Sequence, residues 1–280
     1  MRFGYLGPVG TFSHAALLAS PRLAEDAEEV PCSSEREAIV AVQEGRIDAA
    51  LVPVENAIEG GVNATVDALI HDAPDVVIEG EELLDVSHAL IGRPGVELDD
   101  VTEVISHPQP LGQCRGSLAR MFPGRPLRAV SSTAEAVRIV AESSAPLVAV
   151  GHPEAAPLYG VSVIREAIED APGNKTRFWW VGRAGTSTTA TAASAWKSSI
   201  VFGGDGDNEP GWLLNSLAAF ADRGINLTRI ESRPSREHLG HYVFLIDVAG
   251  RAEAEPLTGA LGALRGRGTS VRVLGSYPVA

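Results

Sequence analysis

The sequence predicts an α/β protein in which a large two-lobed part precedes a smaller ferredoxin-like unit. Within residues 1–183, short apolar runs alternate with helix-period segments, which is typical of α/β units around mostly parallel strands. Residues 184–196 carry no charge and are rich in Ser, Thr and Ala, which is typical of a linker. Residues 197–280 follow the order strand, helix, strand, strand, helix, strand, which predicts a βαββαβ unit.

Length, composition and charge narrow the class of protein. The 280 residues exceed a typical domain, and 45% hydrophobic with 21% charged residues excludes wholesale disorder. The net charge of −13 comes from 14 basic and 27 acidic residues in 1–196, against 9 and 9 in 197–280. Because the balance of acidic and basic residues changes at the 184–196 segment, this segment is interpreted as a linker rather than as a surface loop within one domain. Without a basic run, the chain lacks the signature of a nucleic-acid or anionic-membrane binder, so we expect small-molecule partners.

The cysteines and the apolar pattern favour a cytoplasmic protein. Cys32 and Cys114 are the only cysteines, and neither has metal-ligand spacing, so both are expected to be reduced thiols. The amino terminus lacks the apolar core of an export signal, and no stretch approaches the roughly 20 apolar residues that span a bilayer. We therefore expect a protein that is neither exported nor embedded in a membrane, and no metal site.

Eight strands are expected in the large part. A capping box over 34–37 opens a helix to Gly45, and Thr133 opens another helix to about Ser143. A strand pair near 76–91 and a return near 160–182 divide this part into two lobes, with ligands expected in the crevice between them. The predicted strands are Arg2–Leu6, Ala49–Val54, Val76–Leu84, Val86–Ile91, Glu103–Ser106, Leu127–Val130, Leu147–Val150 and Phe178–Val181.

The smaller unit is predicted from helical spacing of apolar residues and from short β-rich runs. Its sheet has one face to cover and an edge strand to pair, so we expect side-by-side dimerisation. Its predicted elements are Ser198–Phe202, the helix Gly211–Arg223, Ile225–Glu231, Tyr242–Val248, the helix Glu255–Arg265 and Val271–Leu274.

Four polar clusters lie where a cleft is expected, each at a strand end or a strand start. The loop 7–13 offers backbone N–H groups and the hydroxyls of Thr11 and Ser13 at a helix start, although a plain capping loop fits equally well. The other clusters are Glu55 with Asn56, the segment Ser106 to Gln113 and Cys114, and the segment Asn174 to Phe178.

Eight stretches of the chain together match the pattern of a known family. They are YLGPVGTFSHAA (5–16), PCSS (31–34), ALVPVENAIEGGVNATVD (50–67), SHPQPLGQCR (106–115), STAEA (132–136), NKTRF (174–178), GINLTRIESRP (224–234) and LGSYP (274–278). On these stretches, the chain resembles monofunctional bacterial prephenate dehydratases. This resemblance implies a two-lobed catalytic domain, like periplasmic binding proteins, over 1–183 (lobes roughly 1–84 with 160–183, and 85–159), a linker over 184–196 and an ACT regulatory domain over 197–280.

The resemblance implies dehydration and decarboxylation of prephenate to phenylpyruvate, with feedback by L-phenylalanine and no cofactor. The site must bind a dianion, align the carboxylate that leaves as CO2 and assist departure of the hydroxide. Three alternatives stay open. They are an arogenate dehydratase, a non-aromatising prephenate decarboxylase, and a two-lobed binding protein that senses an amino acid without catalysis.

Each candidate residue has an expected role under this resemblance. Thr176 is expected to donate to the leaving hydroxyl, and Arg177 to bind a substrate carboxylate through its planar fork. Glu55 is either an acid-assisting residue or a structural one, and His107 is the alternative acid. The further substrate-binding candidates are Thr11, Ser13, Asn56, Ser106, Gln109, Gln113, Asn174 and Phe178, with Cys114 as a wall residue.

Two departures from the family pattern concern tryptophans. Trp212 stands at the start of the first ACT helix, where it is expected to reshape the effector pocket, and Trp179 and Trp180 follow the TRF motif as strand residues, one of them packed inward. The resemblance implies that the effector site forms between two subunits of a homodimer or homotetramer. Its expected residues are Gly211, Trp212, Leu213, Asn226, Leu227, Glu231, Ser232, Arg233 and Pro234.

Overall fold

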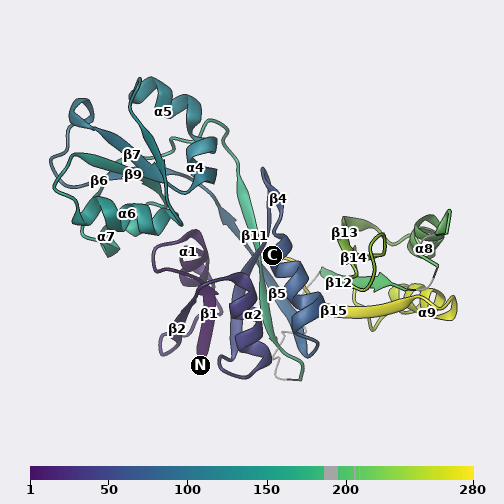
Figure 1. The fold of residues 1–280 in the computed structure, drawn as a ribbon. Helices are drawn as coiled ribbons and strands as arrows, with labels where there is room; N and C mark the ends of the chain where they lie inside the picture. The colour runs from purple at the N-terminus through teal and green to yellow at the C-terminus, as the bar shows by residue number, and fades with distance from the viewer. Residues whose placement is uncertain (186–194, 205, 208) are drawn as a thin grey trace.

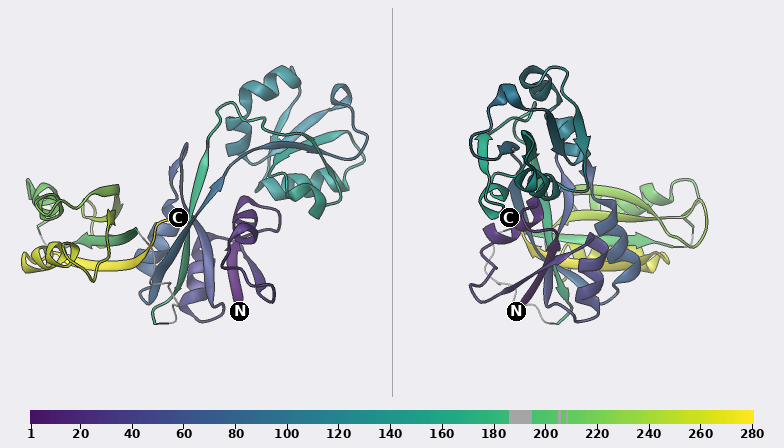
Figure 2. Two further views of the ribbon diagram at one scale, coloured as in Figure 1. Left: turned by 180° about the vertical axis from the view of Figure 1, so that it is seen from behind. Right: turned by 60° about the vertical axis from the view of Figure 1, so that its left-hand side comes forward.

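The chain folds into three regions, each built on its own β-sheet (Figure 1). The computed structural model describes residues 1–185, 195–204, 206–207 and 209–280. Most of the predicted linker lies outside these residues, but β11 ends at Arg183 and β12 already begins at Trp196. The second lobe and the C-terminal unit (residues 195–280) extend from the first lobe in different directions (Figure 2).

The first lobe holds a mixed sheet in the order β2-β1-β3-β11-β5, with the short β4 paired to β3. β1 runs parallel to β2 and β3, whereas β11 is antiparallel to β3 and β5. Helix α1 covers one face of this sheet, and helices α2 and α3 cover the other. The elements are β1 (Arg2–Leu6), α1 (Phe12–Ala19), β2 (Glu28–Cys32), α2 (Glu35–Gln43), β3 (Ala49–Asn56), β4 (Gly60–Gly61), α3 (Asn63–Asp67), η1 (Ala68–Asp72), β5 (Val76–Asp85) and β11 (Lys175–Arg183).

The second lobe is inserted between β5 and β11 and has the strand order β10-β6-β9-β7-β8. The apolar faces of its helices pack on both sides of this sheet and form two separate cores. Its elements are β6 (Ala89–Gly92), η2 (Leu98–Asp100), β7 (Glu103–Ser106), α4 (Pro108–Gln113), α5 (Arg115–Met121), β8 (Leu127–Ala129), α6 (Thr133–Glu142), β9 (Leu147–Gly151), α7 (Ala155–Leu158) and β10 (Ser162–Arg165).

Three details differ from the sequence prediction. The chain returns to the first lobe later than residue 160, because β10 pairs with β6 in the second sheet. Strands β2 and β10 were not expected, since each lies at a sheet edge and carries few apolar residues. Trp179 and Trp180 are both buried, because the sheet around β11 is covered on both faces.

The C-terminal unit confirms the predicted βαββαβ order, with the antiparallel strand order β13-β14-β12-β15. Helices α8 and α9 cover one face of its sheet. The opposite face contributes Val201, Leu245, Leu274 and Tyr277 to the same apolar cluster as Trp179 of the first lobe. The elements are β12 (Trp196–Gly203), α8 (Trp212–Ala221), β13 (Leu227–Pro234), β14 (Tyr242–Ala249), α9 (Leu257–Gly266) and β15 (Ser270–Pro278).

Two contacts along β15 show how closely this unit meets the first lobe. The guanidinium of Arg272 donates to the carbonyl oxygens of Leu69 at 2.9 Å and Ala73 at 2.8 Å, near the end of η1. Gly275 lies so close to β5 that a Cβ at this position would overlap the carbonyl oxygen of Ile78.

Among the described helices, none is long and apolar enough to cross a membrane.

The Gly275 contact predicts a position-specific loss of stability. Gly275→Ala forces β15 away from β5, so we expect a free energy of unfolding lower by about 1–3 kcal/mol, as for an overpacked core site. Gly262→Ala is the matched control, because Gly262 lies in α9 with no atom within 4 Å of a new Cβ. Alanine inside a helix gains stability there, by roughly 0.5–1 kcal/mol. Thermal melting of both variants measures this difference, and equal shifts would contradict the close approach.

Candidate active site

A cleft of about 780 Å³ lies between the two lobes of the large part. Both lobes contribute side chains to its wall, and the start of α1 contributes residues close to the chain's amino terminus. The polar lining residues include Thr11, Ser13, Ser33, Glu35, Asn56, Glu59, His88, His107, Gln109, Gln113, Ser131, Ser132, Thr133 and Thr176.

The best-defined feature of the cleft is the pair formed by Asn56 and Thr176. These residues lie opposite each other on the antiparallel strands β3 and β11. The Asn56 Oδ1 atom accepts from the backbone N–H groups of Ile58 at 3.0 Å and Glu59 at 3.1 Å, which sets the orientation of the amide. Its Nδ2 therefore donates to the Thr176 Oγ1 atom, 2.9 Å away. The hydroxyl hydrogen of Thr176 is not used in this bond and is available to a ligand.

A second polar group connects the lobes through Gln113. The Gln113 Oε1 atom lies 2.8 Å from His88 Nε2 and 3.3 Å from Asn174 Nδ2, and Gln113 Nε2 donates to Glu59 Oε1 at 3.3 Å. Because this oxygen can only accept, His88 carries its proton on Nε2. Burial lowers the pKa of His88, which is 2% exposed, so its imidazole is neutral near pH 7.

Helix starts supply the positive electrostatic potential in the cleft. Thr11 caps α1 by accepting from the His14 N–H at 3.2 Å, and Ser132 caps α6 by accepting from the Glu135 N–H at 3.0 Å. Among the described residues that line the cleft, none is Lys or Arg. An anion here is therefore met by helix N-termini, hydroxyls and amides rather than by a cationic side chain.

Aromatic contacts hold the lobes together on one side of the cleft. The Phe12 ring of the first lobe packs edge-on against the rings of His88 and His152 in the second lobe, with centroids 5.3 and 5.0 Å away. The Tyr159 hydroxyl donates to the Val9 carbonyl oxygen at 2.8 Å. These contacts join the start of α1 to the second lobe.

Most of the predicted substrate-binding residues line this cleft. Ser106 and Asn174 lie beneath the surface instead, because the Ser106 hydroxyl donates to the Val150 carbonyl at 2.6 Å and the Asn174 amide donates to Gln113. Cys114 is fully buried outside the lining, and burial raises its pKa to about 12. The predicted residues found in the lining are Thr11, Ser13, Asn56, Gln109, Gln113, Thr176, Phe178 and the alternative acid His107.

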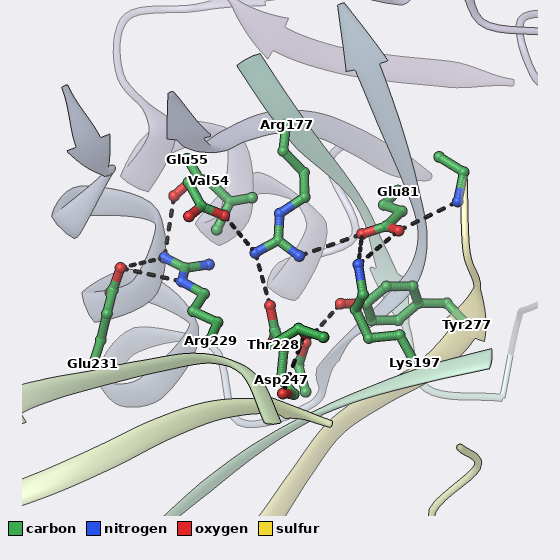
Figure 3. A network of polar contacts seen from close by, with 12 residues as sticks. Val54, Glu55, Glu81, Arg177, Lys197, Thr228, Arg229, Glu231, Asp247 and Tyr277 are labelled. Carbon is green, nitrogen blue, oxygen red and sulfur yellow. Dashed lines mark hydrogen bonds and ion pairs between the residues drawn. The ribbon is translucent and has the colours of Figure 1, made fainter. Parts of the chain in front are cut away.

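The structure places Arg177, which was expected to bind a substrate carboxylate, outside the lining of the cleft. Side chains alternate along a strand, so Arg177 points to the face of the sheet opposite Thr176. There it forms ion pairs with Glu55 at 2.9 Å, Glu81 at 3.3 Å and Asp247 at 2.7 Å, at the junction with the C-terminal unit (Figure 3). Glu55, the other predicted catalytic residue on this face, does not line the cleft either.

The sequence analysis did not predict seven of the polar residues in the lining. Two of them, His88 and Glu59, reach the cleft because the lobes meet there, so no local pattern marks them. His88 falls within the predicted strand Val86–Ile91, but in the structure it lies between β5 and β6. The other five are Ser33, Glu35, Ser131, Ser132 and Thr133.

The predicted effector residues fall into two groups. Gly211 has the left-handed backbone angle φ +85° before α8, and the Trp212 ring lies 6.0 Å from those of Phe202 and Phe244. On β13, the Glu231 carboxylate packs on Gly61 of β4. Trp212 and Leu213 pack against the same apolar core as Leu227. Among the described residues, no hydrogen bond or ion pair joins Gly211 or Trp212 to residues 231–234. Leu213 packs beside Trp212 and Leu227 begins β13, with Asn226 just before it, and Ser232, Arg233 and Pro234 follow on the same strand.

Comparison with known families decides the identity of this architecture. Residues 3–186 match the family model for prephenate dehydratase, and residues 206–266 match that for the ACT domain. The chain belongs to the prephenate dehydratase family. The C-terminal unit is thus its ACT domain, and the resemblance seen in the sequence is confirmed.

Three relatives illustrate the similarity. The prephenate dehydratase of Mycobacterium bovis (strain BCG / Pasteur 1173P2) is 38% identical, covering 99% of this chain and 87% of the relative. The crystal structure of prephenate dehydratase in complex with L-Phe from Arthrobacter aurescens has a TM-score of 0.91 at 38% identity, covering 100% and 90% of the two chains. A structure described as GqqA, a novel type of quorum quenching acylase, has a TM-score of 0.87 at 31% identity, covering 100% and 98%.

Burial of His88 predicts a loss of stability at mildly acid pH. Its folded-state pKa lies below the ordinary value, so the unfolded chain binds the proton more readily. Stability should therefore fall as the pH decreases through about 6.5, the ordinary histidine pKa. We expect the free energy of unfolding to drop less between pH 7.5 and 5.5 in His88→Gln than in the native chain.

Urea unfolding at the two pH values measures this difference. His71 and His152, whose pKa values burial also lowers, remain in both proteins, so part of the decrease persists. His238→Gln, at an exposed turn, is the matched control. An identical decrease in the native chain and in His88→Gln would contradict the assignment of a buried, neutral imidazole.

Proposed function

We propose that this chain is a prephenate dehydratase, whose cleft converts prephenate to phenylpyruvate, water and CO2 for L-phenylalanine biosynthesis. The observation that carries the proposal is the Thr176 hydroxyl, which Asn56 holds in the cleft at 2.9 Å. Family membership and the L-Phe complex of the Arthrobacter aurescens relative add support.

The reaction requires the protein mainly to orient the substrate and to stabilise the leaving group. The bond between the ring and its carboxylate breaks, and its electron pair enters the ring as CO2 leaves. The C–O bond at the opposite ring carbon breaks, and the departing hydroxide takes up one proton to become water. Because aromatisation drives the reaction, the site must orient the dianion and stabilise the leaving group.

Thr176 is placed to stabilise the leaving hydroxide. Its Oγ1 already accepts from the Asn56 amide, so its own hydrogen is directed elsewhere and can be donated to the leaving oxygen. A hydrogen bond to an oxygen that gains negative charge strengthens as the C–O bond breaks, so it lowers the barrier more than it tightens substrate binding.

The dianion is held by neutral groups and helix N-termini. Ser13 and the starts of α1 and α6 present hydroxyls and backbone N–H groups, while Gln109 and Gln113 present amides from the second lobe. Thr11 contributes by capping α1, since its own hydroxyl donates to a backbone carbonyl oxygen at 2.8 Å. The Phe178 ring provides apolar wall beside them. Closure of the lobes around the substrate would exclude water and strengthen these interactions.

Arogenate is the second candidate substrate, and one observation favours it. Arogenate carries an ammonium group where prephenate has a carbonyl, and two carboxylates, Glu35 and Glu59, line the cleft. A non-aromatising decarboxylase and a binding protein without catalysis gain no such support. The GqqA relative is described as an acylase, and an acylase hydrolyses an acyl amide. Among the described cleft residues, no Ser or Cys is hydrogen-bonded to a His, so that reaction gains no support here. Parallel assays with prephenate and arogenate decide between the two substrates.

L-Phenylalanine is the proposed effector and a second copy of the chain the proposed partner. β13 lies at a sheet edge, and it carries Ile230, which is 47% exposed, while Tyr242 at the start of the neighbouring β14 is 44% exposed. A dimer formed along this edge could bring the two groups of predicted effector residues together across the interface. We also infer a cytoplasmic location, which the reduced, buried thiols of Cys32 and Cys114 support.

The role of Thr176 predicts a specific kinetic defect. Thr176→Val keeps the β-branched shape but removes the donor, so we expect kcat to fall by about 10²–10⁴ with a smaller change in KM. Thr176→Ser restores the hydroxyl and should recover much of kcat. Absorbance of phenylpyruvate measures both variants. If Thr176→Val retains the native kcat, the leaving-group role passes to another donor, His107 being next.

Effector binding predicts a ligand-dependent stability. L-Phenylalanine should raise the melting temperature of the full chain by mass action on the folded dimer, and should lower the rate of phenylpyruvate formation. D-Phenylalanine, with the same composition and opposite configuration, is the control and should have a weaker effect. If L-phenylalanine changes neither the melting temperature nor the rate, the effector assignment is wrong.

A further inference from the structure

Arg177 occupies the centre of a buried ionic network between the catalytic domain and the ACT domain (Figure 3). Its Nη2 atom contacts Glu55 Oε2 at 2.9 Å and Asp247 Oδ2 at 2.7 Å, while Nη1 contacts Glu81 Oε2 at 3.3 Å. These carboxylates come from β3, β5 and the ACT strand β14. One guanidinium therefore ties three strands together across the domain boundary.

Two of the three carboxylates are buried and themselves held in place. The side chains of Asp247 and Glu81 are 0% and 2% exposed. Asp247 Oδ1 accepts from Ser199 at 2.6 Å, and Glu81 accepts from Lys197 at 2.8 Å. Although burial by itself lowers the pKa of Arg177, Asp247 and Glu55 outweigh it and raise that pKa, so the guanidinium stays charged. The ACT strands β12 and β14 thus hold the group that Arg177 binds.

The network lies directly behind the Asn56–Thr176 pair. Thr176 is paired with Asn56 and Arg177 with Glu55 in consecutive positions of β11 and β3. On the cleft face Asn56 donates to Thr176, and on the ACT face Arg177 contacts Glu55. The two pairs are separated only by the backbone of the sheet, and the register shifts immediately afterwards, between Arg177 and Phe178. A displacement of the Arg177 side chain therefore acts on the backbone that places the Thr176 hydroxyl.

We propose that Arg177 is a positioning residue through which Asp247 of the ACT domain sets the place of the Thr176 hydroxyl in the cleft. This inference rests on the proposed function of Thr176 and assigns the arginine of the TRF motif to domain coupling rather than to substrate binding. A shift of β14 relative to β11 changes the Arg177–Asp247 contact, and so changes kcat without altering any residue that touches substrate.

The test is a double-mutant cycle between Asp247 and Thr176 in the full chain, with prephenate as substrate. Asp247→Asn keeps the shape of the side chain and removes the charge opposite Arg177. We expect kcat to fall about tenfold with KM within twofold of native, because misplacement of a catalytic group by about 1 Å costs up to about 100-fold. In the Thr176→Val background, which has no hydroxyl to misplace, we expect Asp247→Asn to change kcat less than twofold.

Asp67→Asn provides the matched control. It removes another ion pair across the same domain boundary, in which both contacts between Asp67 and Arg233 are 2.8 Å, but it has no link to Thr176. Its kcat should equal that of the native chain. If Asp247→Asn unfolds the chain, Glu55→Gln replaces it, because the Glu55 side chain is 41% exposed and tolerates the change.

The outcomes separate this inference from the proposed function. Equal losses of kcat from Asp247→Asn in both backgrounds would overturn the coupling while leaving the dehydratase assignment intact. An Arg177→Lys variant with raised KM and native kcat would also overturn it, because that split indicates direct substrate binding. Native kcat in Thr176→Val would refute the proposed role of Thr176 first, and the inference with it.

Discussion

The antiparallel pairing of β11 between β3 and β5 is the constraint on which the rest of the structure depends. β11 lies inside the first-lobe sheet, and its two tryptophans are buried on opposite faces, Trp179 toward the ACT side and Trp180 toward α1. Because side chains alternate along a strand, each residue of β11 belongs either to the cleft face or to the ACT face. The strand therefore carries the candidate catalytic hydroxyl and the main domain contact at neighbouring positions.

This arrangement also explains how an acidic chain can bind a dianion without a cationic side chain in the lining. Arg177, the nearest arginine in sequence to Thr176, has its charge matched by three carboxylates on the other face. The start of α1, which has no acidic residue in its first turn, supplies positive potential, and this effect is strongest close to the first turn. Buried hydroxyls and amides are already oriented, as Asn56 shows, so little reorganisation accompanies the reaction.

Local sequence patterns were sufficient to predict much of the fold. They were not sufficient to predict which residues face the cleft and which face the ACT domain. The boundaries of β1 and β7 match the prediction, because β7 is a short apolar run with polar ends and β1 ends at Leu6, directly before a Gly-Pro pair. The TRF motif was placed at the start of a strand predicted from Phe178, whereas β11 begins at Lys175 and includes the whole motif. Thr176 and Arg177 were both assigned to the cleft. Only the tertiary structure shows that the sheet is covered on both faces, which sends Arg177 to the ACT domain and buries both tryptophans. His88 was missed for a similar reason, since its partners Gln113 and Phe12 come from distant segments.

The junction between the domains combines an apolar cluster with buried ion pairs, and the two kinds of interaction have different effects. The apolar cluster shared by Trp179, Leu245 and Tyr277 supplies most of the stabilisation, because apolar burial contributes in proportion to area. Buried ion pairs add little net stability, since desolvation offsets much of their attraction, but they are sensitive to geometry. The Arg177 network therefore contributes little to the stability of the domain contact. It determines instead how the two domains are positioned relative to each other. A regulatory domain attached in this way can change the placement of Thr176 at a small cost in stability, because the apolar contact persists while the ionic contacts rearrange.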